Sequence, residues 1–290
     1  MTYPDELRLE VEHYLEALRF SDEQLVGGLE EAMRYSLLAG GKRIRPVLTL
    51  ATARAIGRDA RQLLPLAAAI ELIHTYSLIH DDLPAMDDDD LRRGRPTNHR
   101  VYGEDVAILA GDGLYAEAFR LLLTRQAGEP AGLLRTVAVL AMATGVNGMV
   151  GGQYLDVAGR AAGGPEGLRH LHELKTGRLI GASVVCVLLL VGADETATVA
   201  YRRFAGELGV LFQIVDDILD VTGTDADLGK PHGSDERQGR RTYVSEYGLG
   251  GARELAAASY HQACHRLDEA AGGTATELRQ ITDFIFTRTS

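Results

Sequence analysis

The 290-residue sequence contains no tryptophan and only two cysteines, and aromatic side chains make up just 6 % of it. Cys186 and Cys264 lie far apart in helical patterns, so we expect neither a disulfide framework nor a zinc site. A β-sandwich would use many more aromatic and β-branched side chains. Alanine, leucine and glycine are abundant instead, which favours helices packed through small residues.

Positive charge is also scarce, because 30 Lys and Arg residues stand against 41 Asp and Glu residues, a formal net charge of −11. A nucleic-acid partner requires a basic surface, so we expect none. Long hydrophobic runs are missing too: the most apolar stretch, 179–191, has about 13 residues, whereas a bilayer requires roughly 20. The N-terminus is acidic and amphipathic, unlike a secretory signal. We therefore expect a cytoplasmic protein without a membrane span.

What the sequence does contain is helical periodicity along nearly its whole length. Glycine and proline turns separate the periodic stretches, and no stretch alternates as a strand would. There is no internal repeat and no low-complexity linker, so residues 1–290 are expected to form a single all-α domain. The expected helices are 5–19, 22–38, 45–56, 61–82, 102–124, 131–157, 167–191, 194–221, 243–270 and 274–287.

The first candidate site lies in the irregular segment 83–98 and the residues just before it. Six aspartates, which include Asp81, Asp82 and Asp87, fall within the ten residues 81–90, and three arginines follow within five residues. Carboxylates that collect Mg²⁺, placed beside guanidinium groups, suit a diphosphate ligand. A solvated acidic turn with surface ion pairs is the alternative.

The second cluster lies inside a strongly apolar helix, at 208–221. On a helical wheel, Gln213, Asp216, Asp217 and Asp220 fall within a stripe about 100° wide, and apolar side chains fill the other faces. Charged carboxylates in a core require partners. A metal-filled cavity would supply them, so we interpret the two clusters as opposite walls of one cavity. Neither cluster has the ligand spacing of an EF-hand.

Basic residues occupy three further junctions between predicted helices. Lys42 and Arg45 lie in a glycine-rich turn, Lys175 and Thr176 precede Gly177 in a helix, and Lys230 follows the second cluster. Each alone is compatible with ordinary solvated charge. In so acidic a chain, these groups together with the arginines after the first cluster indicate two anionic ligands.

These motifs resemble those of the trans-prenyl diphosphate synthase family, and they occur in the family's order across essentially the whole chain. The first aspartate-rich motif is His80-Asp-Asp-Leu-Pro-Ala-Met-Asp87, and the second is Phe212-Gln-Ile-Val-Asp-Asp-Ile-Leu-Asp220. Gly40-Gly-Lys-Arg-Ile-Arg-Pro46 and Lys175-Thr-Gly177 match the remaining signatures. The resemblance implies a homodimer of ten or more helices per chain, each bundle surrounding a deep central cavity.

The resemblance also implies roles for individual residues. Asp81, Asp82 and Asp87 would hold two Mg²⁺ ions, and Asp216, with Asp220 nearby, would hold a third. The residues implied for the allylic diphosphate are Arg92, Lys175, Thr176, Gln213 and Lys230. Those implied for isopentenyl diphosphate are Lys42, Arg45, His74 and Arg93.

The implied reaction is head-to-tail condensation of isopentenyl diphosphate with dimethylallyl or geranyl diphosphate to give farnesyl diphosphate. Geranylgeranyl diphosphate synthesis is the nearest alternative. A terpene cyclase would leave Lys42, Arg45 and Arg93 without a second diphosphate to hold. A non-catalytic partner subunit would be expected to lose carboxylates from one cluster, and a Mg²⁺-binding scaffold fits less well still. The chain departs from the family at Arg240, where lysine is usual, so a diphosphate contact by Arg240 is left open.

Product length is expected to depend on the helix that leads to Asp81. Each C5 unit adds about one helical turn, so residues one to two turns before Asp81 would form the floor beneath the growing chain. Ser77 lies under Asp81 but is small. Tyr76 is bulky, although an ideal helix places it about 140° away from Asp81. We predict that Tyr76 limits the product to C15; a core tyrosine with no such role is the alternative.

Overall fold

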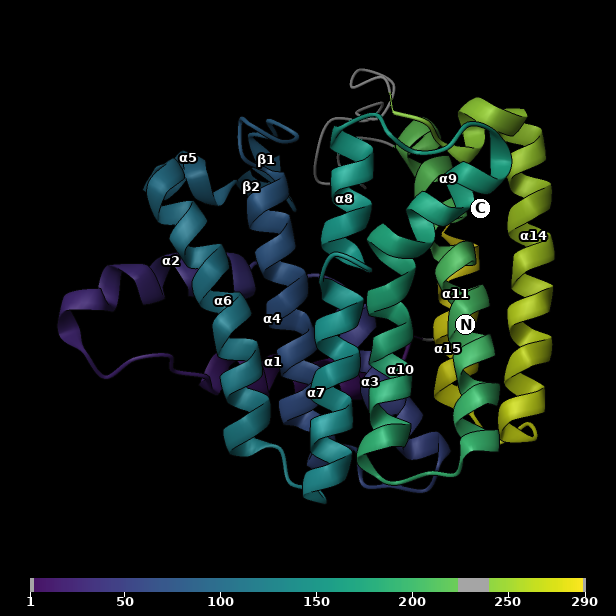
Figure 1. The fold of residues 1–290 in the computed structure, drawn as a ribbon, viewed down its shortest axis with the longest axis horizontal. Helices are drawn as coiled ribbons and strands as arrows, with labels where there is room; N and C mark the ends of the chain where they lie inside the picture. The colour runs from purple at the N-terminus through teal and green to yellow at the C-terminus, as the bar shows by residue number, and fades with distance from the viewer. Residues whose placement is uncertain (1–2, 224–239, 289–290) are drawn as a thin grey trace.

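The computed structural model describes residues 3–223 and 240–288, and they form a bundle of antiparallel helices (Figure 1). The helices at its centre alternate in direction along the chain. Lys230 lies outside the described residues. The long helices are α4 (Leu64–Asp81), α6 (Glu104–Arg125), α7 (Pro130–Thr144), α10 (Arg178–Leu190), α11 (Glu195–Thr222) and α14 (Tyr243–Ala271).

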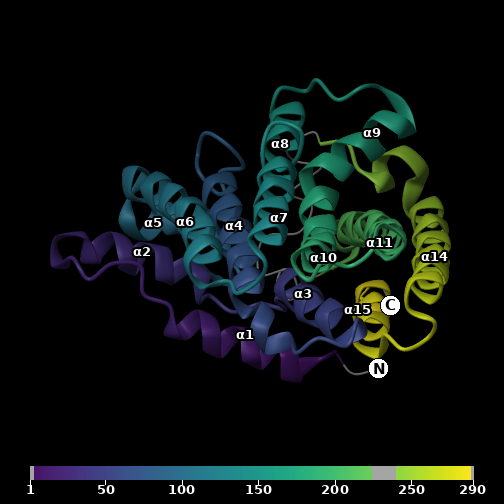
Figure 2. The ribbon, with the colours of Figure 1, turned by 60° about the horizontal axis from the view of Figure 1, so that its bottom comes forward.

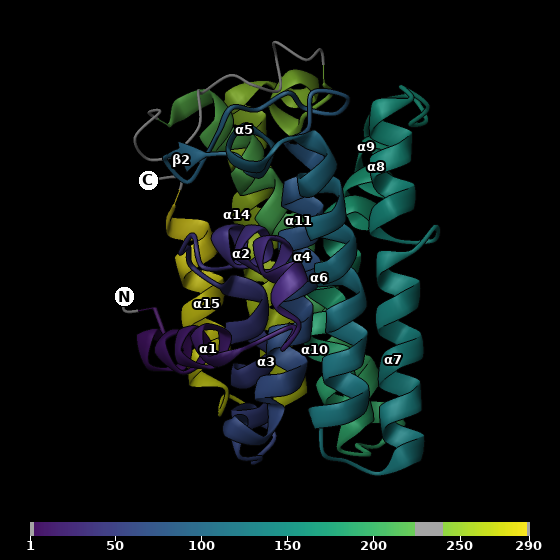
Figure 3. The same ribbon diagram turned by 90° about the vertical axis from the view of Figure 1, so that its left-hand side faces the viewer.

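Shorter helices cover the flanks of this bundle. In Figure 2, α1, α3 and α15 lie beneath the long helices, and Figure 3 shows α1 and α2 on one side with α7 and α8 on the other. The remaining elements are α1 (Asp5–Ala17), η1 (Gln24–Val26), α2 (Gly27–Leu37), α3 (Ile44–Ala55), η2 (Ala60–Leu63), α5 (Asn98–Tyr102), α8 (Met149–Val157), α9 (Gly164–His172), η3 (Glu173–Gly177) and α15 (Thr276–Thr287).

A continuous apolar core runs from α1 to α15. Its centre is α4, in which every residue from Pro65 to Ile73 is buried, including Glu71. Such all-round burial is typical of a core helix rather than a surface helix. Phe204 of α11 is the largest of the fully buried side chains. The prediction of an all-α fold with ten or more helices is confirmed for the described part of the chain.

Two helices expected to be continuous are interrupted, and a third, α14, is kinked at Gly248, where φ is 68°. The expected helix 131–157 is broken between α7 and α8, where Gly145 and Gly148 leave helical geometry. A Cβ on Gly148 would lie 2.0 Å from the carbonyl oxygen of Ala143, so only glycine fits this bend. The expected helix 167–191 contains the π-helical turn η3, a feature that often marks a functional site. Periodicity alone reveals neither interruption.

The segment 83–98, expected to be irregular, contains two short strands. β1 (Leu91–Arg92) pairs antiparallel with β2 (Arg95–Pro96), and Gly94 between them has a φ of 72°. Strands of two residues have too little pattern to be recognised in a sequence. The hairpin returns the chain towards α4 and so places Arg92 beside the first aspartate cluster.

Two helical stretches among the described residues are long and apolar enough to cross a membrane by length and composition, a feature that the sequence analysis did not identify. Ala60–Asp81 is 67 % buried and packs as the core helix already described. Pro130–Val157 is only 33 % buried and is broken between α7 and α8. Its apolar surface is therefore exposed in the single chain.

Candidate functional site

The candidate site lies where the carboxyl ends of α4, α8 and α11 meet. All three helices run towards the upper end of the bundle in Figure 1, because α6 runs downward between α4 and α7–α8 and α10 runs downward between α8 and α11. Asp81 is the last residue of α4, Asp156 is next to last in α8, and Asp216 lies about two turns before the end of α11. The negative ends of these helix dipoles favour cations at this place.

The first aspartate cluster folds back on its own helix. The backbone N–H of Asp87 donates to the carbonyl of Asp81 at 2.8 Å, and that of Asp88 donates to Leu83 at 3.1 Å. Asp88 adopts a left-handed backbone, with a φ of 55°, which is uncommon outside glycine. This tight turn brings Asp87 next to Asp81 and explains why two carboxylates six residues apart belong to one site.

Asp82 is paired with Arg92 in this structure. Asp82 is 3 % exposed, and Arg92 donates to it through Nε at 2.9 Å and also through Nη2. Arg92 Nη2 contacts Asp89 at 3.2 Å as well. Two residues predicted to bind different groups, a metal ion and a diphosphate, therefore bind each other in this structure.

Burial raises the pKa of Asp81 from its ordinary value to about 7, with Asp87 adding to the rise and Lys175 opposing it. Ionising a buried carboxylate costs free energy unless a cation binds beside it. Among residues 3–223 and 240–288, no three metal-ligating side chains gather as a complete cage. Mg²⁺ commonly takes one or two carboxylates and completes its shell with water and phosphate oxygens. Asp81 and Asp87 fit that mode of binding.

Arg240 and Lys175 connect the first cluster to α8. Lys175 Nζ donates to Asp156 Oδ2 at 2.6 Å. Arg240 donates to Asp87 Oδ1, and its Nε lies 3.7 Å from Asp156 Oδ2. Both cations therefore lie beside Asp156, Arg240 also pairs with Asp87, and Arg240 lies within the site even though it replaces the usual lysine.

A chain of hydrogen bonds links the π-helical turn η3 to the second aspartate cluster. Thr176 donates to Gln213 at 2.9 Å, and Gln213 Nε2 donates to Asp217 Oδ1 at 2.7 Å. Asp217 Oδ2 accepts from the backbone N–H of Tyr243, the first residue of α14, at 2.7 Å. The 1 %-exposed carboxylate of Asp217 thus orients Gln213 and Thr176 and anchors α14.

Asp216 and Asp220 have different surroundings although both belong to the predicted stripe. Asp220 is buried, whereas the side chain of Asp216 is 54 % exposed and lies 3.7 Å from Arg288 Nη2. Arg288 also stacks over the Phe212 ring at 5.8 Å, and Arg45 stacks over the same ring at 5.6 Å. Of the two carboxylates, Asp216 is the more accessible to a metal ion.

The second basic group is built on the 40–45 turn, α4 and the β1–β2 hairpin. Arg45 Nη1 lies 3.3 Å from His74 Nε2, and Arg93 donates to the carbonyl of Gly40. Burial, aided by Arg45 and Arg93, holds the pKa of His74 well below its usual range. Neutral His74 therefore accepts from Arg45. Arg45, His74 and Arg93 therefore lie together, and Lys42, from the same turn, has its Nζ 5.3 Å above the Phe284 ring.

Several residues of the site were not identified from the sequence: Asp156, Gln153, His172 and Arg288. The Gln153 amide and both His172 ring nitrogens are buried without a hydrogen bond to the described residues. Burial lowers the pKa of His172 to about 4. The pair Gln153 and Asp156, spaced three apart at the end of an otherwise apolar helix, was the available signal.

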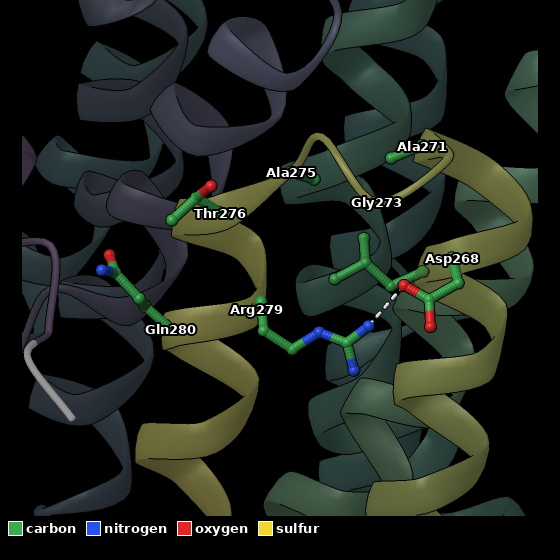
Figure 4. Close-up of a pocket in the computed structure, with 8 residues that line it drawn as sticks. Asp268, Ala271, Gly273, Ala275, Thr276, Arg279 and Gln280 are labelled. Carbon is green, nitrogen blue, oxygen red and sulfur yellow. Dashed lines mark hydrogen bonds and ion pairs between the residues drawn. The ribbon is translucent and has the colours of Figure 1, made fainter.

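A hollow of about 200 Å³ lies elsewhere, between the end of α14 and the start of α15 (Figure 4). Arg279 reaches across it to Asp268, and small residues such as Ala271 and Gly273 form much of its wall. None of the predicted site residues lines this hollow. It is therefore a separate feature from the aspartate site.

Comparisons with known proteins show the family to which the chain belongs. The family model "Polyprenyl synthetase" matches residues 27–274. The farnesyl diphosphate synthase of Geobacillus stearothermophilus is 50 % identical over 235 residues, which are 78 % of this chain and 77 % of that one. The chloroplastic geranylgeranyl pyrophosphate synthase of Capsicum annuum is 46 % identical over 260 residues, 89 % of this chain and 70 % of that one. A geranyltransferase structure from Helicobacter pylori, complexed with magnesium and isoprenyl diphosphate, has a TM-score of 0.89 at 32 % identity over 99 % of each chain. The chain therefore belongs to the polyprenyl synthetase family.

Proposed function

We propose that the chain condenses isopentenyl diphosphate with dimethylallyl or geranyl diphosphate and releases farnesyl diphosphate. The observation that carries the proposal is the presence of two separate basic groups beside the aspartate clusters. Lys175 and Thr176 lie on η3, whereas Lys42 and Arg45 lie on the turn before α3 and at its start. A reaction that joins two diphosphates requires two such groups, and a cyclase requires one. Magnesium-dependent consumption of isopentenyl diphosphate tests the proposal.

The metal ions in this proposal are three Mg²⁺. Asp81, Asp82 and Asp87 would hold two of them, and Asp216, with Asp220 nearby, would hold the third. Bound Mg²⁺ supplies neutralisation of the charge that develops on the departing diphosphate. Binding of a metal ion by Asp82 requires that Arg92, whose Nε and Nη2 both donate to Asp82 Oδ1, exchange this oxygen for an oxygen of the diphosphate, which accepts charge-assisted hydrogen bonds in the same way.

The chain's own residues bind the two diphosphates and exclude water. Lys175, Thr176, Gln213 and Arg92 hold the allylic diphosphate, and Lys230, outside the described residues, is assigned to the same group. Lys42, Arg45, His74 and Arg93 hold isopentenyl diphosphate. Apolar side chains around the site keep water from trapping the allylic cation as an alcohol. The released diphosphate takes the proton that is lost when the new double bond forms.

The C15 length of the product is assigned to Tyr76. Its side chain is buried against α6, where its ring centroid lies 5.0 Å from that of Tyr115, and Tyr115 lies 5.2 Å from Phe119. Within α4 the Tyr76 ring lies edge-on to His80, at 5.6 Å. Ser77 donates instead to the carbonyl of His74, so its hydroxyl is held against its own helix. A cluster of edge-to-face aromatic rings between α4 and α6 supports the role of a floor for Tyr76.

Replacing Tyr76 with alanine is expected to shift the main product from C15 to C20 or longer. The substitution removes the first ring of this aromatic cluster and leaves Tyr115 as the next side chain that blocks the growing product chain. Product chains sized by chromatography after hydrolysis give the measurement, and Tyr76→Phe is the control because it keeps the ring. An unchanged product profile in Tyr76→Ala would make Tyr76 an ordinary core residue.

The proposal also includes a homodimer, a single domain over residues 1–290, a cytoplasmic location and no membrane span. The support for a dimer is the set of exposed apolar side chains on and between α6, α7 and α8; α7 and α8 form the right-hand edge of the bundle in Figure 3. Its exposed side chains include Leu134 (64 %), Met142 (59 %) and Val146 (80 %). Large exposed apolar patches are typical of protein interfaces. A continuous core and a family match over 27–274 support a single domain.

The double variant Leu134→Glu/Met142→Glu is expected to convert the dimer to a monomer, because it places two charges on each copy of a buried face. Light scattering coupled to gel filtration measures the mass, which should fall from twice the chain mass to the chain mass. Leu25→Glu is the control, since Leu25 is 92 % exposed on η1. A wild type that is already monomeric contradicts the proposed interface.

A further inference from the structure

Arg43 occupies the centre of the glycine-rich turn that carries Lys42 and Arg45, but its surroundings are unlike theirs. Its side chain has no exposed surface, and its backbone is left-handed, with a φ of 53° and a ψ of 39°. Residues other than glycine rarely adopt this conformation. Among the described residues other than glycine, only Asp88 and Arg93 share a positive φ, and both lie in the loop after α4. Such strained positions persist where surrounding contacts enforce them.

The contacts that enforce the Arg43 conformation come from three different helices. Its Nε donates to Glu12 Oε1 of α1 at 2.9 Å, and its Nη1 donates to Glu71 Oε1 of α4 at 2.6 Å. Its Nη2 donates to the carbonyl of Leu37, the last residue of α2, at 2.6 Å, and to Glu12 Oε2 at 3.3 Å. Every nitrogen of the guanidinium is therefore engaged within the protein.

These contacts exclude a direct role for Arg43 in binding a diphosphate. A phosphate oxygen could reach its guanidinium only by displacing buried partners. Both partner carboxylates are well enclosed, since the side chain of Glu71 is 2 % exposed and that of Glu12 is 17 % exposed. One guanidinium between two carboxylates has a formal net charge of about −1, so this cluster would repel an anion rather than bind it.

The cluster is nevertheless connected to the residues assigned to isopentenyl diphosphate. Glu71 and His74 lie one turn apart on α4, so the helix presents Glu71 to Arg43 and His74 to Arg45. The carbonyl of Lys42 accepts from the Tyr3 hydroxyl at 2.7 Å. The Tyr3 hydroxyl thus fixes the backbone at Lys42, and Glu12, Glu71 and Leu37 fix the side chain of Arg43.

The charge of Glu71 gives the cluster a second effect. Glu71 lies close enough to act electrostatically on Arg45 and Arg93. With Arg43 present, the 2.6 Å ion pair between Arg43 and Glu71 offsets part of this negative charge. Without Arg43, the carboxylate would repel a diphosphate and compete with it for Arg45.

We propose that Arg43, held by Glu12 and Glu71, is a positioning residue for the isopentenyl diphosphate site, fixing the turn that aims Lys42 and Arg45. The inference rests on the proposed function. It assigns to Arg43 no contact with substrate. It predicts that loss of the cluster weakens binding of one diphosphate and leaves the other unaffected.

The test is the double variant Arg43→Met/Glu71→Met, with Glu12→Gln as a milder second variant. Replacing a buried ion pair with apolar residues of similar volume commonly preserves stability, so the double variant should fold. We expect its KM for isopentenyl diphosphate to rise about tenfold or more, the effect of losing one charge-assisted contact. The KM for geranyl diphosphate and the kcat at saturation should stay within about threefold of wild type. Glu12→Gln should raise the same KM by a smaller factor.

Arg54→Met is the matched control. Arg54 lies on α3, the helix that directly follows Arg43, and pairs with Glu6 and Glu277 at the surface. Its loss removes ion pairs between α3 and two neighbouring helices, and both KM values should remain unchanged. Arg43→Gly separates the backbone from the side chain, because glycine adopts the left-handed conformation freely. Its KM for isopentenyl diphosphate should rise as in the double variant.

Three results would overturn the inference. The first is an unchanged KM for isopentenyl diphosphate in a double variant that folds, and the second is a parallel rise in its KM values for isopentenyl and geranyl diphosphate. The third is a wild-type KM for isopentenyl diphosphate in Arg43→Gly. If the double variant does not fold by circular dichroism, Glu12→Gln decides, and an unchanged KM there overturns the inference. Turnover of both diphosphates by the wild type tests the proposed function separately. A failure of the enzyme and a failure of the cluster therefore give different results.

Discussion

Asp81→Ala and Asp216→Ala are each expected to lower kcat about a thousandfold, the loss that corresponds to the several kcal/mol a metal ion contributes to a developing charge. Each substitution removes a carboxylate from one wall of the site and no side chain from the apolar core. Steady-state assays across a range of Mg²⁺ concentrations give the measurement. Near wild-type activity of either variant at low Mg²⁺ would mean that the proposed metal site is wrong.

Asp81→Asn provides the control that separates lost chemistry from lost folding. The pKa of Asp81 is raised to about 7 by burial, so its charge destabilises the metal-free fold increasingly as pH rises from about 4 to about 7. Above pH 7 the penalty is fully present. Asparagine removes it, and Tm at pH 8 without Mg²⁺ should be equal to or higher than that of wild type. A lower Tm would point to a structural role for the carboxylate.

Lys42→Ala and Lys175→Ala are expected to have opposite effects on the two substrates. Lys42→Ala should raise the KM for isopentenyl diphosphate, and Lys175→Ala should raise that for the allylic diphosphate. Each should change by roughly tenfold to a hundredfold, since a charge-assisted phosphate contact contributes about 1.5–3 kcal/mol. Lys175 also neutralises Asp156, with which it forms a 2.6 Å hydrogen bond, so its loss should lower kcat as well.

The control for these substitutions is the corresponding pair of arginine variants. Lys42→Arg and Lys175→Arg keep the charge but change its shape, so they should recover part of the lost affinity. The sequence has only three lysines, at 42, 175 and 230, among its 30 basic residues. The other 27 of these positions are arginine, so a reagent that modifies lysine would act on few side chains and offers an independent check of the same two sites. Equal effects of Lys42→Ala and Lys175→Ala on both substrates would contradict two separate diphosphate sites.

The sequence was sufficient to predict helices and to identify the residues that carry charge into the core. The stripe on α11 was visible because Gln213 and Asp217 interrupt an apolar helix at helical spacing. The helical pattern could not distinguish the two neighbouring aspartates, however. The side chain of Asp216 is half exposed, whereas Asp217 accepts hydrogen bonds from Gln213 and from the backbone N–H of Tyr243. That difference depends on where α14 begins relative to α11, a contact between residues 26 apart.

The contacts that could not be predicted are those made between distant segments. The bond from Arg240 to Asp87 joins residues 153 apart, and no local pattern specifies it. The hydrogen bond from Lys175 to Asp156 depends on the break between α7 and α8, which changes the path of α8. Arg43 looked like one more basic residue of its motif, and only its burial against Glu12 and Glu71 distinguishes it from Lys42.

The most direct test of the proposed reaction is to incubate the purified chain with Mg²⁺, dimethylallyl diphosphate and labelled isopentenyl diphosphate, and to size the products. The proposal predicts magnesium-dependent label mainly in C15, with none when the allylic diphosphate is omitted. Label chiefly in C20 would favour the geranylgeranyl alternative and contradict the role given to Tyr76. Absence of any labelled product, with geranyl diphosphate alone converted to a hydrocarbon, would contradict the two-diphosphate reaction itself.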